Sequence, residues 1–160
     1  MPLAFYAALL TLVGAAHVAA FETRQPVEGM IALTRFAGRF EIVSQLLIEE
    51  GTGFVPLTVP AGKFLMLRQV TATCTVGNGI LHFWTIRSSA NNLVHHYLPI
   101  KRVGPDSYGS RVWISNQRVQ IPVRAGSRPV ATFQKSALDS SNEACVGSWA
   151  GYFEDAAAPQ

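Results

Sequence analysis

The sequence has little charge, two cysteines and none of the common phosphate- or zinc-binding motifs. Charged residues make up 14% of the 160 residues, against about 25% in an average soluble domain. Because Cys74 and Cys145 stand 71 positions apart, they form no C-x-x-C pair. Neither G-x-x-x-x-G-K nor G-x-G-x-x-G occurs. The motifs that most often identify a nucleotide-binding protein or a zinc protein from sequence are therefore missing.

Charge is absent from residues 1–20, MPLAFYAALLTLVGAAHVAA, which contain no Asp, Glu, Lys or Arg. Val18 and Ala20 fit the small-residue rule for signal cleavage before Phe21, although no Lys or Arg follows Met1. We predict that residues 1–20 are a signal peptide, and the alternative is a retained anchor or packed hydrophobic helix. Residues 21–155 then form one domain, and residues 156–160 a flexible tail.

Helical periodicity is also missing after residue 20. Short stretches rich in Val, Ile, Phe, Trp and Thr are separated by Gly, Pro and Asn, which is typical of an all-β protein. We expect a single antiparallel β-sandwich of jelly-roll type after the signal-like segment. Residues 37–50 fit either one long strand or a strand followed by a helical turn. The expected turns lie at Asn78-Gly79, which predicts a hairpin, and at 60–62, 104–106, 116–117, 125–127 and 139–142.

Cys74 stands in the stretch TATCTV, where side-chain parity indicates which way it points. Residues two apart in a strand share a face. Counting from Phe64, one face carries Phe64, Met66, Arg68, Val70, Ala72, Cys74 and Val76, and near the cysteine the other face is threonine. Cys145 shares a face with Trp149 and Phe153 by the same count. Both cysteines are therefore predicted to point inward.

Two inward cysteines in an exported chain favour a disulfide between Cys74 and Cys145. The alternatives are two buried free thiols or a reactive cysteine, which needs an accessible, electropositive setting. Trp84, ten residues after Cys74, also suggests an immunoglobulin-like fold. That interpretation is weaker because Glu143 stands where such domains have a tyrosine, and only fifteen residues follow Cys145.

Three stretches carry a resemblance to a protein family: VPAGKFLMLRQVTATCTV, PVRAGSRPVATFQKS and ACVGSWAGYFED. Together they resemble small exported bacterial β-sandwich proteins of uncharacterised function, over about half of the chain. Phe153 and Glu154 depart from the aliphatic and small residues usual at the end of that pattern. The resemblance implies the fold and export, and it transfers no active-site residue.

The histidines give a weak indication of a metal site. His82 and His96 could approach each other if neighbouring strands align, but His95 and His96 are adjacent and face opposite ways in a strand. No Glu follows them at the spacing that metal-binding jelly rolls use. We therefore expect no metal and no cofactor, with His82 and His96 as the only weak candidates.

Aromatic residues provide the candidate ligand-binding site. Tyr97, Tyr108 and Trp113 could form a stacking platform for sugar rings, with Arg111 as a polar partner. Most aromatic rings in a sandwich pack in the core, so packing is the alternative role for each of them.

Residues 101–128 form a basic segment, with six basic residues and one acid, Asp106. Either this is an ordinary solvated sheet face, or it is a cationic surface for an acidic polymer or membrane head groups. The candidate residues of that surface are Lys101, Arg102, Arg118, Arg124 and Arg128.

The functional hypothesis is an exported, non-enzymatic binding or structural module, secreted, periplasmic or at the cell surface. Its partner would be a glycan or another surface protein, or a second copy of the chain, for which residues 46–48 (LLI) could form an interface. Export argues against nucleic acid, and signal cleavage would leave no stable membrane span. The alternatives are a carbohydrate-binding module that uses loop aromatics, and a small metal-dependent enzyme built on His82 and His96.

Overall fold

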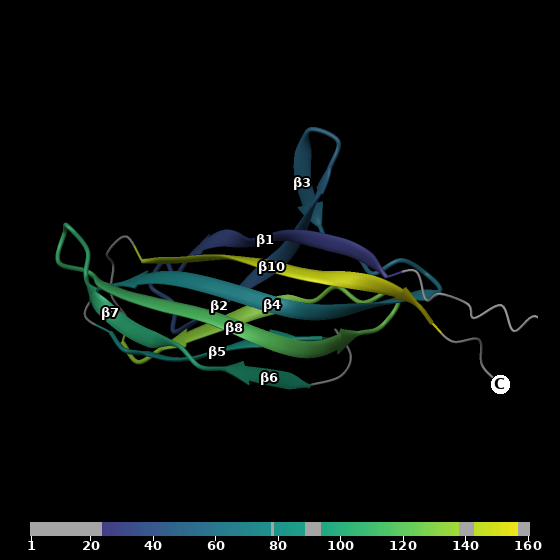
Figure 1. Cartoon of the computed structure of the whole chain (residues 1–160). Coiled ribbons are helices and arrows are strands. Elements are labelled where there is room, and N and C mark those ends of the chain that lie inside the picture. Colours follow the sequence, from purple (N-terminus) through teal and green to yellow (C-terminus); the bar gives the residue numbers. More distant parts are fainter. Residues whose placement is uncertain (1–23, 78, 89–93, 138–142, 157–160) are drawn as a thin grey trace, which may run out of the picture.

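The computed structural model describes residues 24–77, 79–88, 94–137 and 143–156, and their regular structure is entirely β (Figure 1). The all-β prediction is confirmed. No helix in the described part could span a membrane. The strands are β1 (Gln25–Arg35), β2 (Glu41–Glu50), β3 (Gly53–Pro56), β4 (Lys63–Val76), β5 (Leu81–Arg87), β6 (His95–Leu98), β7 (Lys101–Pro105), β8 (Arg111–Val123), β9 (Val130–Lys135) and β10 (Ala144–Asp155).

The strands form one curled antiparallel sheet, a half-barrel, in the order β6-β5-β9-β2-β1-β10-β4-β8-β7, with β3 attached to β2. The sheet folds back on itself at β2, which belongs to both halves of the curl (Figure 1). Its first half, from Glu41 to Gln45, pairs with β9, and Leu46–Ile48 pair with β1. The curl brings β8 close to the end of β6, where the Ser115 hydroxyl donates a hydrogen bond to the Pro99 carbonyl (2.5 Å).

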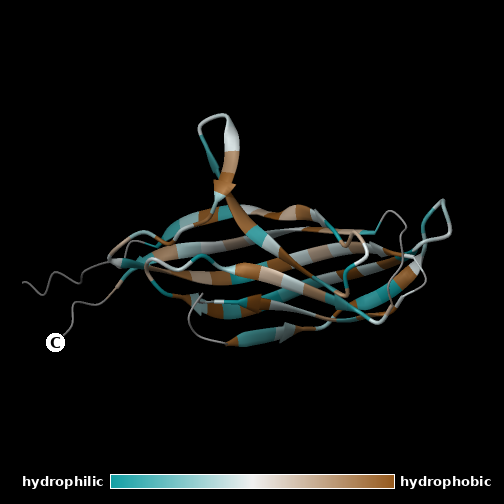
Figure 2. Ribbon diagram, turned by 180° about the vertical axis from the view of Figure 1, so that it is seen from behind, coloured by the Kyte–Doolittle hydropathy of each residue, from teal (hydrophilic) through white to brown (hydrophobic). Residues whose placement is uncertain are grey.

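The hydrophobic core fills the inside of the curl. Trp84 of β5 stacks parallel to Phe133 of β9, with ring centroids 5.6 Å apart, and both rings are fully buried. Figure 2 shows hydrophobic and hydrophilic residues alternating along the strands, because one face of each strand points into the curl and the other into solvent.

A β-bulge in β4 changes which residues point inward. The pairing of β4 with β8 shifts register between Leu67 and Gln69. Beyond the bulge, the predicted inward face is confirmed: Val70, Ala72, Cys74 and Val76 are buried. Before it the prediction is wrong, because the extra residue of a bulge reverses the alternation. Leu65 and Leu67 are buried there, whereas Arg68 is exposed and Phe64 and Met66 only half-buried.

Cys74 and Cys145 lie directly opposite each other on β4 and β10, with Cα atoms 4.1 Å apart. Both are fully buried, and the structure places their sulfur atoms as a disulfide pair. The predicted pairing and the inward orientation agree with this arrangement. The cross-link joins two neighbouring strands near the middle of the sheet.

Two of the predicted turns are wrong. β4 and β5 do not form a hairpin around Asn78-Gly79, because β10 and β8 already occupy both edges of β4 and the chain crosses to β9 and β6 instead. At 116–117, Asn116 and Gln117 lie within β8, paired with Thr71 and Val70 of β4.

The predicted turns at 60–62 and 125–127 do separate strands, and residues 41–50 are a strand throughout. The turn predicted at 104–106 is displaced, because Gly104 and Pro105 belong to β7 and the turn to β8 spans 106–110. Residue 78, the run 139–142, the segment 1–20 and residues 157–160 of the tail lie outside the described residues.

Gly29 of β1 permits a close approach of three strands. A Cβ atom at this position would collide with the Leu47 carbonyl oxygen of β2 and with the indole ring of Trp149 of β10. In the space left by the missing side chain, the Trp149 indole N–H donates a hydrogen bond to the Leu47 carbonyl (3.0 Å). The tight bend at β2 therefore depends on glycine here.

We predict that Gly29→Ala lowers the free energy of unfolding by about 1–3 kcal/mol, because the added methyl group overpacks a site bounded by backbone. Urea unfolding followed by tryptophan fluorescence measures the change. The matched control is Gly53→Ala in β3, where a Cβ would meet no atom within 4 Å. Equal stability of the Gly29→Ala variant and the natural sequence would contradict the close packing of β2 and Trp149 against Gly29.

Candidate functional site

A hairpin formed by the end of β2 and by β3 stands away from the rest of the sheet (Figures 1 and 2). We call residues 48–56 the arm. Its turn is at Gly51, which has a φ of 61°, a left-handed conformation that glycine adopts without strain. Ile48 still packs against the core, whereas Phe54 is 52% exposed. The arm is therefore anchored at its base and presents an apolar side chain to solvent.

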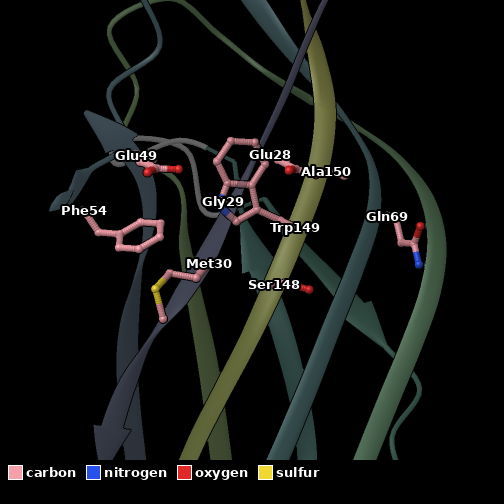
Figure 3. Close-up of a pocket in the computed structure, with 9 residues that line it drawn as sticks. All are labelled: Glu28, Gly29, Met30, Glu49, Phe54, Gln69, Ser148, Trp149 and Ala150. Carbon is pink, nitrogen blue, oxygen red and sulfur yellow. The ribbon is translucent and has the colours of Figure 1, made fainter. Parts of the chain in front are cut away.

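A groove of about 430 Å³ lies between the arm and the outer face of the sheet (Figure 3). We call it the arm groove. In Figure 3, Phe54 and Glu49 of the arm lie on one side of β1, and Gln69 lies beyond β10 on the other side. The residues that line it are Glu28, Gly29, Met30, Glu49, Phe54, Gln69, Ser148, Trp149 and Ala150.

The floor of the arm groove mixes polar and apolar residues, and two of its polar side chains are hydrogen-bonded to neighbouring strands. The hydroxyl groups of Thr71 and Ser148 lie 2.8 Å apart, and the Gln69 amide donates to the Asn116 side-chain oxygen (3.2 Å). These bonds link side chains on neighbouring strands across the outer face. With an apolar wall at Phe54, such a surface suits an extended ligand that contacts both polar and apolar groups.

Beyond Gln69 and Ala150 a second hollow of about 610 Å³ opens on the same outer face. We call it the arginine hollow, because Arg68 of β4 and Arg118 of β8 line it. The register shift in β4 at Arg68 adjoins a second shift in β10 between Ala150 and Gly151. Two neighbouring bulges with small residues at one of them leave the face hollowed here.

The predicted ligand-binding residues Tyr97 and Tyr108 are exposed but belong to different parts of the sheet. Tyr97 of β6 is 67% exposed and packs edge-on against Phe83, with centroids 5.4 Å apart. Tyr108 is 92% exposed in the turn between β7 and β8, where its backbone N–H donates to the Asp106 carboxylate (2.8 Å). Neither residue lines the arm groove.

Trp113 and Arg111 of β8 have contacts that favour packing roles. Trp113 is half-buried against the core and lies opposite Cys74. The Arg111 guanidinium donates a hydrogen bond to the Gly79 carbonyl (3.1 Å) and so ties β8 to the link between β4 and β5. The structure therefore does not gather the four predicted residues into one platform.

The predicted basic residues are all exposed, and they lie on β7, on β8 and in the turn after β8. Arg128 donates a hydrogen bond to the Thr58 hydroxyl (3.1 Å). Arg118 lines the arginine hollow together with Arg68, which lies on β4 outside the predicted basic segment. Lys101 lines a separate hollow of about 320 Å³ between β7 and β8.

His82 and His96 are not brought together. His96 of β6 lies opposite Ile86 of β5, four residues along from His82, which corresponds to about 13 Å of strand. Within the described ranges, no three His, Cys, Asp or Glu residues are grouped so that they could hold a metal ion.

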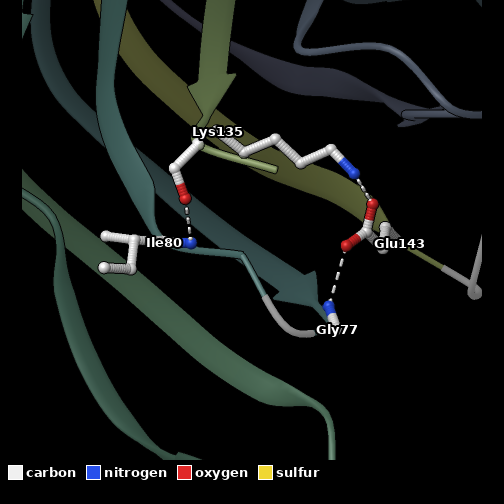
Figure 4. Close-up of polar contacts among 5 residues, drawn as sticks. Gly77, Ile80, Lys135 and Glu143 are labelled. Carbon is white, nitrogen blue, oxygen red and sulfur yellow. Dashed lines mark hydrogen bonds and ion pairs between the residues drawn. The ribbon is translucent and has the colours of Figure 1, made fainter. Parts of the chain in front are cut away.

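A buried ion pair, which the sequence pattern did not predict, joins Lys135 at the end of β9 to Glu143 just before β10 (Figure 4). Both side chains are almost completely buried. The Glu143 carboxylate also accepts a hydrogen bond from the Gly77 N–H (2.9 Å). The Lys135 ammonium lies 5.0 Å from the centroid of the Phe36 ring.

This ion pair lies where the ends of four strands, β1, β4, β9 and β10, meet. The Phe36 N–H, after β1, donates to the Glu143 carbonyl (3.1 Å), and the Lys135 N–H donates to the Phe40 carbonyl (2.9 Å). Because Glu143 precedes Cys145 by two residues, the ion pair and the disulfide secure the same end of the curl. The pair is thus part of the contacts that hold this end of the curl together.

Comparison of the chain with protein-family models, with curated proteins and with solved structures finds no match. The site is therefore interpreted from its own geometry.

We predict that Lys135→Met lowers the free energy of unfolding by about 3–5 kcal/mol, because it leaves the Glu143 carboxylate buried without its counter-ion. The double variant Lys135→Met/Glu143→Gln should recover most of this loss. Urea unfolding provides the measurement. The control is Lys63→Met, which breaks an exposed pair with Asp155 (3.2 Å) and should cost less than about 1 kcal/mol. Similar losses for Lys63→Met and Lys135→Met would contradict a buried pair.

Burial lowers the pKa of His96 below its usual value of 6.5, because desolvation disfavours the imidazolium form. The unfolded chain then binds a proton at a pH where the folded chain does not. Stability from this group is therefore present above pH 6.5 and falls as the pH drops through 6.5 towards the folded-state pKa.

We predict that His96→Gln reduces the fall in melting temperature between about pH 7.5 and about pH 5.5. Thermal unfolding at a series of pH values measures it. His82→Gln, at an exposed position of β5, is the control for the loss of a histidine elsewhere on the sheet. An unaltered slope in the His96 variant would show that another group causes the pH dependence.

Proposed function

We propose that this protein is an exported, non-enzymatic β-sandwich that acts as a binding or structural assembly module at the cell surface, in the periplasm or in an extracellular assembly. The observation that carries the proposal is the arm groove, an open channel between a protruding hairpin and a face of mixed polar and apolar residues. Its two carboxylates, Glu28 and Glu49, are exposed. An open, solvated groove suits contact with a long partner better than chemistry that requires water to be excluded.

The sandwich of jelly-roll type is part of this proposal, and the strand order supports it. Eight strands divide into β1-β10-β4-β8 and β2-β9-β5-β6. The connections from β1 to β2, from β4 to β5 and from β8 to β9 each pass from one group to the other, as in two interlocked Greek keys. The three stretches that resemble exported bacterial β-sandwich proteins fall on β4, β9 and β10.

Export is supported by two features. Disulfides persist in oxidising compartments, and Cys74 and Cys145 are placed as a disulfide pair. The uncharged segment 1–20 has the character of a signal peptide. Secretion, periplasmic retention and surface attachment are all consistent with these features.

A carbohydrate-binding module is the second candidate. The observation that favours it is the exposed ring of Tyr97, which Phe83 and His95 flank at centroid distances of 5.4 Å and 6.3 Å. An exposed tyrosine held by neighbouring rings is a suitable surface for stacking a sugar. The arm groove is the stronger candidate because it combines a wall, a floor and charge in one place.

We predict that the photo-reactive residue benzoylphenylalanine, placed at position 54, cross-links to the binding partner on irradiation. The variant is expressed and irradiated in cells that export it, so that the natural partner is present. The groove wall should be in contact with the partner, so the intact mass of the purified protein should rise. The matched control places the same group at Val43, 44% exposed on β2, outside the groove. An adduct at position 43 alone, or at neither position, would rule out the arm groove as the binding surface.

A further inference from the structure

The arm carries negative charge that no ion pair neutralises among the residues that the structure describes. Glu49 and Glu50 lie at its end, next to the turn at Gly51, and both are exposed. Among the described residues no ion pair involves either carboxylate. Phe54 faces Glu49 across the two strands of the arm. The arm therefore presents two carboxylates and one apolar ring on a narrow, two-stranded element.

The arginine hollow carries the opposite charge. Arg68 and Arg118 are both exposed, and within the part of the chain described no carboxylate pairs with them. The hollow is about 610 Å³ and has the small residues Ala150 and Gly151 at its base. Two guanidinium groups beside a shallow floor form a recess that suits carboxylates, because guanidinium binds a carboxylate through two parallel hydrogen bonds.

The acidic arm and the arginine hollow of one molecule are kept apart by the arm groove. Glu49 lines the groove on the arm side, whereas Gln69 and Ala150 line both the groove and the hollow. Two complementary charged features that do not pair with each other in the described part of one molecule can both form ion pairs with a second molecule.

We propose that the arm of one copy docks into the arginine hollow of a second copy, with Glu49 and Glu50 meeting Arg68 and Arg118. The inference rests on the proposed role as a binding or assembly module, and it names a second copy of this chain as the partner of the arm. In this arrangement Phe54 covers the small residues of the floor, which buries apolar surface beside the ion pairs.

The contact joins two different surfaces, the arm of one copy and the arginine hollow of the other, and this determines the symmetry of the assembly. If two copies exchange arms reciprocally, the contact closes into a two-fold dimer. If they do not, each copy offers a free arm and a free hollow, and the contact propagates as a chain of molecules. Both outcomes are self-association through the same ion pairs.

The test is sedimentation velocity of the purified, disulfide-bonded protein over a range of concentrations and at low and high salt. We expect concentration-dependent association that weakens as salt rises, because salt screens charge pairs. The variants Arg68→Glu/Arg118→Glu and Glu49→Arg/Glu50→Arg should each lower the association constant at least about tenfold. Mixing the two should restore association, because the basic arm of one then fits the acidic hollow of the other.

The control variant is Lys101→Glu/Arg102→Glu, which reverses two exposed charges on β7 outside the hollow and should leave association unchanged. Circular dichroism of every variant confirms that it is folded. A protein that stays monomeric at all concentrations overturns the inference, as does association that neither reversal weakens or that mixing does not restore. A monomer that still forms adducts at position 54 would overturn the self-association alone and leave the proposed function standing.

Discussion

The pairing of β4 with β10 is the interaction on which the other features of the molecule depend. These two strands lie near the middle of the sheet and pair from Ala144 to Asp155, with the disulfide between Cys74 and Cys145 at one end. The same pairing aligns Thr71 with Ser148 on the outer face and Val70 with Trp149 on the inner face. A fixed register here therefore positions the core and the outer surface together.

Irregularities in that pairing shape the outer face. The neighbouring bulges in β4 and β10 hollow the sheet beside Arg68, and Gly29 lets Trp149 reach across β1 to the backbone of β2. β2 can then leave the curl and continue into the arm. The groove and the hollow are thus consequences of how the strands bend, and a flat sheet with the same residues would have neither.

The buried ion pair at the end of the curl affects the stability of the fold rather than the shape of the outer face. Lys135 and Glu143 are buried among apolar residues, where an ion pair contributes little net stability but is costly to break. Because Glu143 also binds the Gly77 and Phe36 backbones, the pair fixes which chain ends meet. The ion pair therefore holds together the ends of β1, β4, β9 and β10 at this end of the curl.

The sequence by itself determined the local features: an all-β chain, the turns around Gly62 and Gly126, and the inward face around Cys74, all of which follow from residue type and two-residue periodicity. Only the tertiary structure decided that β4 and β5 separate, that the alternation reverses at Arg68, that Lys135 and Glu143 are buried, and that Phe54 stands on an arm. The separation of β4 and β5 depends on which strand edges are already occupied by distant strands, and the other three depend on a register shift or on what packs around the residue. Local patterns carry no information about that competition, since strand pairing is settled between segments far apart in the chain.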